Sequence, residues 1–405
     1  MLNKDGQREL AYVVAIDEIR PIEGYDRVEY ARVGGWWVIV RKDQFKVGDL
    51  AIYIEVDSRV PEQEPFMFLE KRNFKVKTLK MCKVISQGLL MSPEDFGWQS
   101  KVDHISFADG GLDGYVQVGD FLTQKLGITY ADAADNKRKA NSEDKYKKMA
   151  QRNGKLFSKQ PFRWLMKRDW GKKLLFVFFG RKKDKKNGWP GWVVKTDEER
   201  CQNMPWLFPG NPDEEWIATE KVDGTSTTFT MKGFGRKREF YICSRNVVFD
   251  KPEKECYYDT NVYVEMAEKY NVEQVLADIL DMHKDELEFV TAQGETYGEG
   301  IQKRDYGLKE HRLKIFNLIY GYKNGEVKRF NPIEMRQILA IYGLPCVDIV
   351  DEHYKIPATC DEMLAAAGGE STIDGGMREG LVFRSYDGVK SFKAVDNAFL
   401  LKYHG

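Results

Sequence analysis

The stretch Thr219-Glu220-Lys221-Val222-Asp223-Gly224-Thr225 carries the strongest chemical signal in this chain of 405 residues. Only an uncharged lysine amine attacks an electrophile, so a nucleophilic lysine needs burial or a nearby positive charge to lower its pKa. Asp223 lies two residues after Lys221, and in an extended or tightly turned segment both side chains can point to the same side. Asp223 could there hold a hydrated divalent cation, which would disfavour the ammonium form of Lys221 and neutralise a phosphate. Gly224 allows the backbone to turn sharply beside a ligand.

Alone, the Lys-x-Asp-Gly pattern also fits an ordinary turn between two strands, because it arises by chance in roughly one chain in ten of this length. Further motifs in a fixed order favour the chemical interpretation. They are Ser244-Arg245-Asn246, Gly294-Glu295-Thr296-Tyr297-Gly298, Lys314-Ile315-Phe316-Asn317-Leu318, Glu379-Gly380-Leu381-Val382-Phe383-Arg384 and Ser391-Phe392-Lys393.

In this order the motifs resemble those of the covalent nucleotidyltransferases, the superfamily of ligases and capping enzymes. The resemblance implies that Lys221 attacks ATP and carries AMP as a covalent adenylate. It also implies that Glu220 helps to select adenine and that Phe316 stacks on the base. Taken singly, Phe316 would more often be an ordinary core residue.

The same resemblance assigns the remaining site residues. Glu295 is expected to bind the ribose, and Lys393 to reach the α-phosphate. Asp223 and Glu379 are expected to position Mg²⁺ or Mn²⁺ through its water molecules. Arg200 and Arg245 are expected to meet the bound AMP or the 5′-phosphate end of a nucleic acid.

Two features narrow the resemblance to RNA ligases. Arg200 closes the run Lys195-Thr196-Asp197-Glu198-Glu199-Arg200 and precedes Lys221 by 21 residues, and Gly300-Ile301-Gln302-Lys303 directly follows the Gly-Glu motif. Only 12 residues follow Lys393, too few for the C-terminal barrel of capping enzymes and most DNA ligases. The chain is similar to a small RNA ligase family with an N-terminal oligonucleotide-binding (OB) domain. Unlike many relatives, it has Val395 in place of a second lysine after Lys393.

The N-terminal part fits this order of domains. Short apolar runs at residues 12–16, 28–33, 36–40, 50–56 and 76–85 alternate with turn signals, and Gly34-Gly35 predicts a hairpin. Such a pattern is typical of a small β-barrel of the OB type, although other small barrels fit it as well. From residue 189 the pattern is mixed, with helical periodicity over residues 261–283 and an N-cap signal at Asn331-Pro332.

We therefore predict an α+β protein with three parts. Residues 1–127 form an OB-like nucleic-acid-binding domain, 128–188 a basic linker or insertion, and 189–405 a nucleotidyltransferase domain of antiparallel sheets with flanking helices. Residues 137–195 contain 20 Lys and Arg against 4 Asp and Glu, although the net charge of the whole chain is zero. Such a segment is typical of a surface that binds a polyanion, but a solvated linker has the same composition.

The sequence thus predicts an ATP-dependent RNA ligase that seals nicked or paired 3′-hydroxyl and 5′-phosphate ends in RNA repair. The alternatives are a DNA ligase, an end-adenylating enzyme, or a non-catalytic nucleic-acid-binding protein with a degenerate ligase domain. No apolar run has the length of a membrane span and the first residues do not resemble a signal peptide, so we expect a cytoplasmic protein that acts as a monomer.

Overall fold

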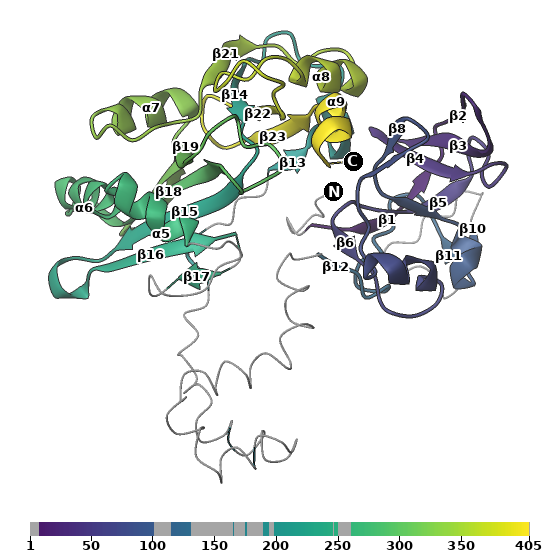
Figure 1. Cartoon of the computed structure of the whole chain (residues 1–405), viewed down its shortest axis with the longest axis horizontal. Helices are drawn as coiled ribbons and strands as arrows, with labels where there is room; N and C mark the ends of the chain where they lie inside the picture. Colours follow the sequence, from purple (N-terminus) through teal and green to yellow (C-terminus); the bar gives the residue numbers. More distant parts are fainter. Residues whose placement is uncertain are drawn as a thin grey trace.

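The computed structural model describes residues 8–100, 115–130, 165, 175, 189–193, 198–245, 247–249 and 261–404. Within these ranges the chain forms two domains that lie side by side (Figure 1). The first is all-β, and the second contains two β-sheets with helices around them. The expected α+β class is confirmed. Among the described residues, no helix is both long enough and apolar enough to span a lipid bilayer.

The N-terminal domain is built from short, mostly antiparallel strands. One sheet has the order β1-β5-β9 and another the order β2-β3-β4. Along β4 the side chains of Trp36, Val38 and Val40 are buried while those between them are less so, as expected for a strand with one face on a core. The strands are β1 (Ala11–Ala15), β2 (Glu18–Ile22), β3 (Tyr25–Val33), β4 (Trp36–Arg41), β5 (Leu50–Ile54), β6 (Ser58–Arg59), β7 (Leu79–Met81), β8 (Val84–Ser86), β9 (Leu89–Met91), β10 (Gln99–Ser100), β11 (Tyr115–Val116) and β12 (Thr129–Tyr130).

Turn residues set the strand boundaries in this domain. Gly34 and Gly35 connect β3 to β4, with Val33 paired to Trp36, so the predicted hairpin is confirmed. The apolar run 76–85 is not one strand but contains the hairpin β7–β8. Its turn residues Cys82 and Lys83 have φ angles of 54° and 64°, in the left-handed region that interrupts a strand.

The C-terminal domain places two antiparallel-rich sheets against each other. The five-stranded sheet has the order β13-β23-β22-β14-β21 and the six-stranded sheet the order β17-β16-β15-β18-β19-β20. The strands are β13 (Glu199–Arg200), β14 (Trp216–Lys221), β15 (Thr225–Lys232), β16 (Glu239–Ser244), β17 (Val248–Phe249), β18 (Leu287–Gly298), β19 (His311–Tyr322), β20 (Val327–Arg329), β21 (Ile349–Tyr354), β22 (Gly380–Arg384) and β23 (Ser391–Val395).

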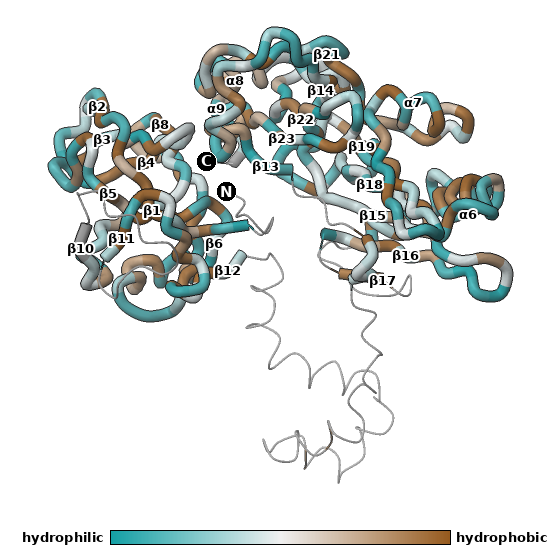
Figure 2. Tube along the Cα trace, turned by 180° about the vertical axis from the view of Figure 1, so that it is seen from behind, coloured by the Kyte–Doolittle hydropathy of each residue, from teal (hydrophilic) through white to brown (hydrophobic). Residues whose placement is uncertain are grey.

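Helices cover the sheets of this domain. Leu276 and Leu280 of α6 share an apolar cluster with Phe229 of β15 and Val290 of β18. Hydrophobic and hydrophilic residues alternate along the turns of α6 (Figure 2), which is the pattern of a helix with one buried face. The described helices are α5 (Val262–Lys269), α6 (Val272–Met282), α7 (Pro332–Ala340), α8 (Cys360–Ala367) and α9 (Asn397–Phe399), and α9 continues into a last helical turn, Leu400–His404.

Two helix predictions have different outcomes. Residues 261–283 are not one helix but the pair α5 and α6, because Asn271 between them adopts φ 48°. Asn331 caps α7 as predicted, since its side chain accepts hydrogen bonds from the backbone N–H groups of Ile333 and Glu334.

Most of the basic segment 137–195, the boundary at residue 188 and Asn246 lie outside the described residues. In the N-terminal domain, β12 pairs with β6, so this domain extends slightly beyond residue 127.

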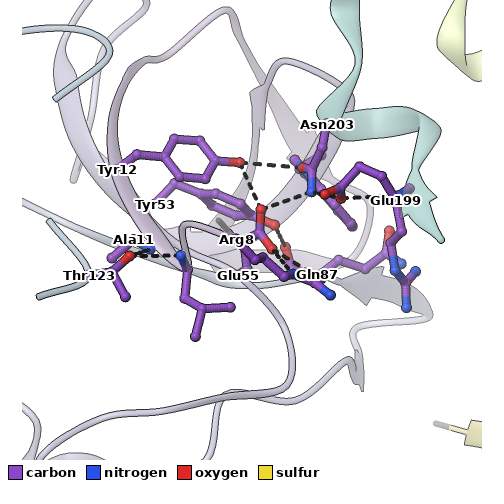
Figure 3. A network of polar contacts seen from close by, with 12 residues as sticks. Arg8, Ala11, Tyr12, Tyr53, Glu55, Gln87, Thr123, Glu199 and Asn203 are labelled. Atoms are coloured by element: carbon purple, nitrogen blue, oxygen red, sulfur yellow. Dashed lines mark hydrogen bonds and ion pairs between the residues drawn. The ribbon is translucent and has the colours of Figure 1, made fainter. Parts of the chain in front are cut away.

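Hydrogen bonds centred on Asn203 join the two domains (Figure 3). Asn203 ends the 3-10 turn Cys201–Asn203 of the C-terminal domain. Its amide Nδ2 donates to the Glu55 carboxylate at 2.8 Å, and its Oδ1 accepts from the indole Nε1 of Trp36 at 2.7 Å. Glu55 and Trp36 are 1% and 2% exposed. Because an unpaired polar group in such a place is costly, Asn203 fixes the N-terminal domain against the C-terminal one.

Gly35 lies at a point of close approach between the domains. A Cβ atom at this position would lie 2.7 Å from the Cα of Gln202 and 2.9 Å from the Sγ of Cys360. Both distances are shorter than van der Waals contact, so this position favours a residue without a side chain.

The substitution Gly35→Ala should therefore lower the free energy of unfolding by about 1–3 kcal/mol through overpacking. Gly191→Ala is the matched control, because no atom lies within 4 Å of the added Cβ there. We expect it to change the free energy by less than about 0.5 kcal/mol. Urea unfolding followed by tryptophan fluorescence measures both values, and equal effects of the two substitutions would contradict the close approach.

Candidate active site

Lys221 lies where the two sheets of the C-terminal domain are connected. It ends β14 of the five-stranded sheet, and residues 222–224 turn the chain directly into β15 of the six-stranded sheet. A Cβ atom at Gly224 would lie 2.3 Å from the backbone oxygen of Thr296 and 2.9 Å from Cγ of Glu295. The turn thus packs closely against β18, and any residue other than glycine here would have to displace atoms of that strand.

The amine of Lys221 forms an ion pair with Glu379. Its Nζ lies 2.7 Å from Oε2 of Glu379, and the two side chains are 24% and 10% exposed. The register explains the contact, because Lys221 pairs with Gly380, the first residue of β22. The predicted proximity of the lysine and the fourth motif's carboxylate is therefore present in the structure.

The charge around Lys221 favours its protonated form. Burial by itself lowers the pKa of this amine, but the carboxylates of Glu379, Glu295 and Asp223 outweigh burial, and the pKa is raised above its usual value. The protein groups alone therefore do not supply the lowered pKa that a nucleophilic amine needs. A positive charge added among these carboxylates would lower the pKa of Lys221, as nucleophilic attack requires.

Glu295 extends from β18 beside the same amine. Burial is the main reason why the pKa of Glu295 is raised, to about 8. The nearby carboxylates of Glu379 and Asp223 add to this effect, and the positive charges of Lys221 and Arg245 oppose it. The structure thus brings the predicted residues Lys221, Asp223, Glu295 and Glu379 into one electrostatic cluster.

Lys393 and Arg200 project from the same face of the five-stranded sheet as Lys221. Thr219, Val382 and Lys393 are paired across β14, β22 and β23, and Arg200 of β13 pairs with Lys393. Paired residues share a face, and so do residues two apart in a strand, so Lys221 belongs to this row. The site therefore has cationic side chains from three strands on one face.

Val395 takes up the position two residues after Lys393. It is 3% exposed and belongs to an apolar cluster with Leu400 and with Ile85 of the N-terminal domain. A lysine here would bury a charge among apolar groups, which is costly. The packing between the domains thus accounts for a valine at this position, and Lys393 remains the expected phosphate ligand of the fifth motif.

Phe316 occupies an irregular position in β19. Gln293 pairs with Asn317 and the next residue, Gly294, pairs with Ile315, so Phe316 is the extra residue of a β-bulge. Bulges change the direction of a side chain and are frequent next to active sites. Phe316 is partly buried against the core, which leaves part of its ring accessible.

Glu220 points away from Lys221, because adjacent residues of a strand face opposite sides of the sheet. It is 2% exposed. Its carboxylate accepts hydrogen bonds from the hydroxyl of Ser371 at 2.6 Å and from the backbone N–H and hydroxyl of Thr372 at 2.7 and 2.5 Å. The structure therefore places the Glu220 carboxylate against the loop 371–376.

The two predicted arginines both contact the N-terminal domain. The guanidinium carbon of Arg200 lies 5.7 Å from the ring centroid of Trp36, and that of Arg245 lies 4.9 Å from the ring centroid of Tyr130. Arg245 also acts electrostatically on Glu295. Both arginines therefore lie between the lysine-centred cluster and the N-terminal domain.

The carboxylates suit a hydrated cation better than a complete protein cage. In the described parts of the chain, no group of three or more His, Cys, Asp and Glu side chains is arranged to hold a metal ion. Asp223 and Glu379 are hard oxygen donors beside the expected nucleophile Lys221. This donor set fits Mg²⁺ or Mn²⁺ that keeps several water molecules and binds substrate phosphates.

Several supporting residues could not be recognised from the sequence as parts of the site. The backbone N–H of Asp223 donates to the Tyr306 hydroxyl at 2.7 Å, and the Gln302 side chain donates to the Gly224 oxygen at 2.9 Å. Arg384, 1% exposed, donates to Asn317 of the opposite sheet and to Glu198. Gln302 and Arg384 lie inside quoted motifs, but only tertiary contacts reveal their partners.

Comparisons with known proteins agree with this arrangement. A family model described as RNA ligase matches residues 214–403, and a model of an OB-fold domain matches residues 10–93. The structure of Naegleria gruberi RNA ligase with pyrophosphate is 24% identical and covers 98% of this chain and 99% of its own, with a TM-score of 0.67. Variants of that enzyme with ATP and Mn and with AMP and Mn give TM-scores of 0.66. No curated protein sequence matched.

The two sheets meet at Lys221 behind an OB-fold domain, which is the arrangement expected of a nucleotidyltransferase. Residues 214–403 of the C-terminal domain match the RNA ligase family model, and the chain is an enzyme of the RNA ligase type. The resemblance to RNA ligases with an N-terminal OB domain is therefore confirmed. The match to the Naegleria gruberi structure covers 98% of this chain, and at 24% identity it shows a shared fold.

The raised pKa of Glu295 predicts a specific pH dependence. The carboxyl has a reference pKa of 4.5 and a pKa of about 8 in the folded protein. Between these values the folded state keeps a proton that the unfolded chain releases, so rising pH favours unfolding. The contribution of Glu295 to stability is complete below pH 4.5 and is lost as the pH rises through about 8.

The variant Glu295→Gln lacks this contribution. The free energy of unfolding of the wild type should therefore fall relative to that of the variant as the pH rises. This change in the difference should be on the order of 1–2 kcal/mol between about pH 5.5 and pH 8. Guanidinium unfolding in a buffer with a metal chelator, repeated across this range, measures the difference. Parallel stability profiles of the two proteins would contradict the raised pKa.

Proposed function

We propose that this chain is an ATP-dependent RNA ligase that joins 3′-hydroxyl and 5′-phosphate ends through a lysyl-adenylate on Lys221. The main support is the position of Lys221 at the junction of the two sheets, with Glu379 at 2.7 Å and with Lys393 and Arg200 on the same face. The family match and the Naegleria gruberi structures with ATP and Mn or AMP and Mn add to this support.

In the first step, Nζ of Lys221 attacks the α-phosphorus of ATP. A phosphorus–nitrogen bond forms, the bond to the bridging oxygen breaks, and pyrophosphate leaves. Lys221 must first lose a proton to solvent, although the surrounding carboxylates raise its pKa. Asp223 and Glu379 would hold a divalent cation through water, and this cation supplies the positive charge that offsets those carboxylates.

The other residues bind and orient the nucleotide. Phe316 stacks on adenine from its bulge, Glu295 binds the ribose, and Lys393 neutralises charge on the transferring phosphate. Positioning and charge neutralisation provide most of the catalysis in such transfers. Because Glu220 faces the loop 371–376, we propose that it acts on adenine selection through the position of β14.

The second and third steps transfer AMP to RNA and seal the strand. An oxygen of the RNA 5′-phosphate attacks the adenylate phosphorus, and Lys221 leaves and regains a proton. The RNA 3′-hydroxyl then attacks the 5′-phosphorus, its proton passes to solvent, and AMP leaves. Arg200 and Arg245 lie beside the N-terminal domain, and we assign them to the AMP and the 5′-phosphate end. All these groups come from one chain, so a monomer suffices.

Lys221→Ala should abolish the transfer of label from α-labelled ATP to the protein in the presence of Mg²⁺, because the attacking amine is removed. Lys232→Ala is the matched control. Lys232 lies on β15, the next strand along the chain, and forms an exposed ion pair with Glu288 at 2.8 Å. Gel autoradiography measures both. Full labelling of Lys221→Ala would refute the assignment.

Sealing should be fastest when both strands at the nick are RNA. The measurement compares nicked duplexes with RNA, DNA or mixed strands at the 3′-hydroxyl and 5′-phosphate sides, at equal enzyme and ATP. Preferential sealing of DNA would identify a DNA ligase, and accumulation of adenylated 5′ ends an end-adenylating enzyme. Binding of RNA without any protein adenylation would identify a non-catalytic binding protein.

A further inference from the structure

The turn after Lys221 is held by a loop that follows the Gly-Glu motif. The hydroxyl of Tyr306 accepts a hydrogen bond from the backbone N–H of Asp223 at 2.7 Å, and Gln302 donates to the backbone oxygen of Gly224 at 2.9 Å. Tyr306 is 4% exposed and has a φ angle of 55°. An aromatic residue rarely adopts this left-handed conformation, so the surrounding contacts must hold it there.

Arg304 holds the ring of Tyr306 in place. Its guanidinium carbon lies 4.2 Å from the centroid of that ring, and Arg304 is 4% exposed. It forms an ion pair with Asp374. It also lies 6.0 Å from the ring of Phe399 and 5.9 Å from that of Tyr403. A buried cation with an ionic partner and three aromatic neighbours is a rigid support.

The residue before Lys221 is held by the loop that contains Asp374. Ser371 and Thr372 donate hydrogen bonds to the carboxylate of Glu220. The backbone on both sides of Lys221 is therefore fixed, on one side through Glu220 and on the other through Asp223 and Gly224. The ion pair between Arg304 and Asp374 connects the two loops that do this.

We propose that Tyr306 and Arg304 are positioning residues that hold Asp223 in register with Lys221 for adenylate transfer, an inference that rests on the function proposed above. Tyr306 contacts the turn directly and Arg304 contacts Tyr306 and Asp374, so both act through the position of the Asp223 carboxylate. A carboxylate that positions a hydrated cation acts only within a narrow range of distances, so a small shift of the turn reduces the rate.

The test uses Tyr306→Phe in the full chain, which removes the hydroxyl and keeps the ring. The maximal rate of self-adenylation should fall by roughly tenfold to a hundredfold. The ATP concentration for half-maximal rate should change by less than about threefold, because binding of the base is not altered. The concentration of MgCl₂ for half-maximal rate should rise.

Tyr354→Phe is the matched control, because it removes a hydroxyl that donates to Sδ of Met363 at 3.6 Å in the same domain. It should behave as the wild type. Asp374→Asn keeps the size of the side chain but removes the ionic partner of Arg304, and should lower the maximal rate in the same way as Tyr306→Phe. Thermal melting of each variant measures whether it is folded at the assay temperature.

Wild-type rates and an unchanged MgCl₂ dependence of Tyr306→Phe would overturn the positioning role. A loss of rate that disappears when the assay is cooled well below the melting temperature would also overturn it, since the role would then be structural only. If the wild type forms no adenylate, the proposed function fails. If the wild type is labelled and both variants match it, only the positioning role fails.

Discussion

Lys221 and Glu379 form their ion pair because β14 ends at the level where its antiparallel neighbour β22 begins. The contact concentrates opposite charge around an amine that has to become neutral in order to react. With Asp223 and Glu295 close by, the site stabilises the ammonium form as long as no further cation is present. This requirement for positive charge connects the lysine to the expected divalent cation and to the basic residues of the same sheet face.

The second constraint is the short connection between the two sheets. Only residues 222–224 separate β14 from β15, and Gly224 lies against Thr296 with no room for a side chain. The connection fixes the distance between the lysine on one sheet and Glu295 on the other. Arg384 adds a buried contact across the same two sheets through Asn317. Asn203 then fixes the N-terminal domain close to Arg200.

Local signals in the sequence predicted what depends on local structure. Gly34-Gly35 predicted the hairpin and Asn331 the cap of α7, because turns and caps are determined by adjacent residues. The order of the motifs predicted the cluster around Lys221. The bulge at Phe316 and the direction of Glu220 were not predicted, since they depend on partners far away in the chain. Glu220, for example, meets Ser371, which lies 151 residues later.

The direct observation of the covalent intermediate would decide the chemistry. After incubation with ATP and MgCl₂, the protein is digested and its peptides are examined by tandem mass spectrometry. We predict a mass increase of one adenylate on the peptide that contains Lys221, with fragment ions that place it on this lysine. An adenylate on Lys314 or Lys393 in place of Lys221, or no adenylate on any peptide, would contradict the mechanism.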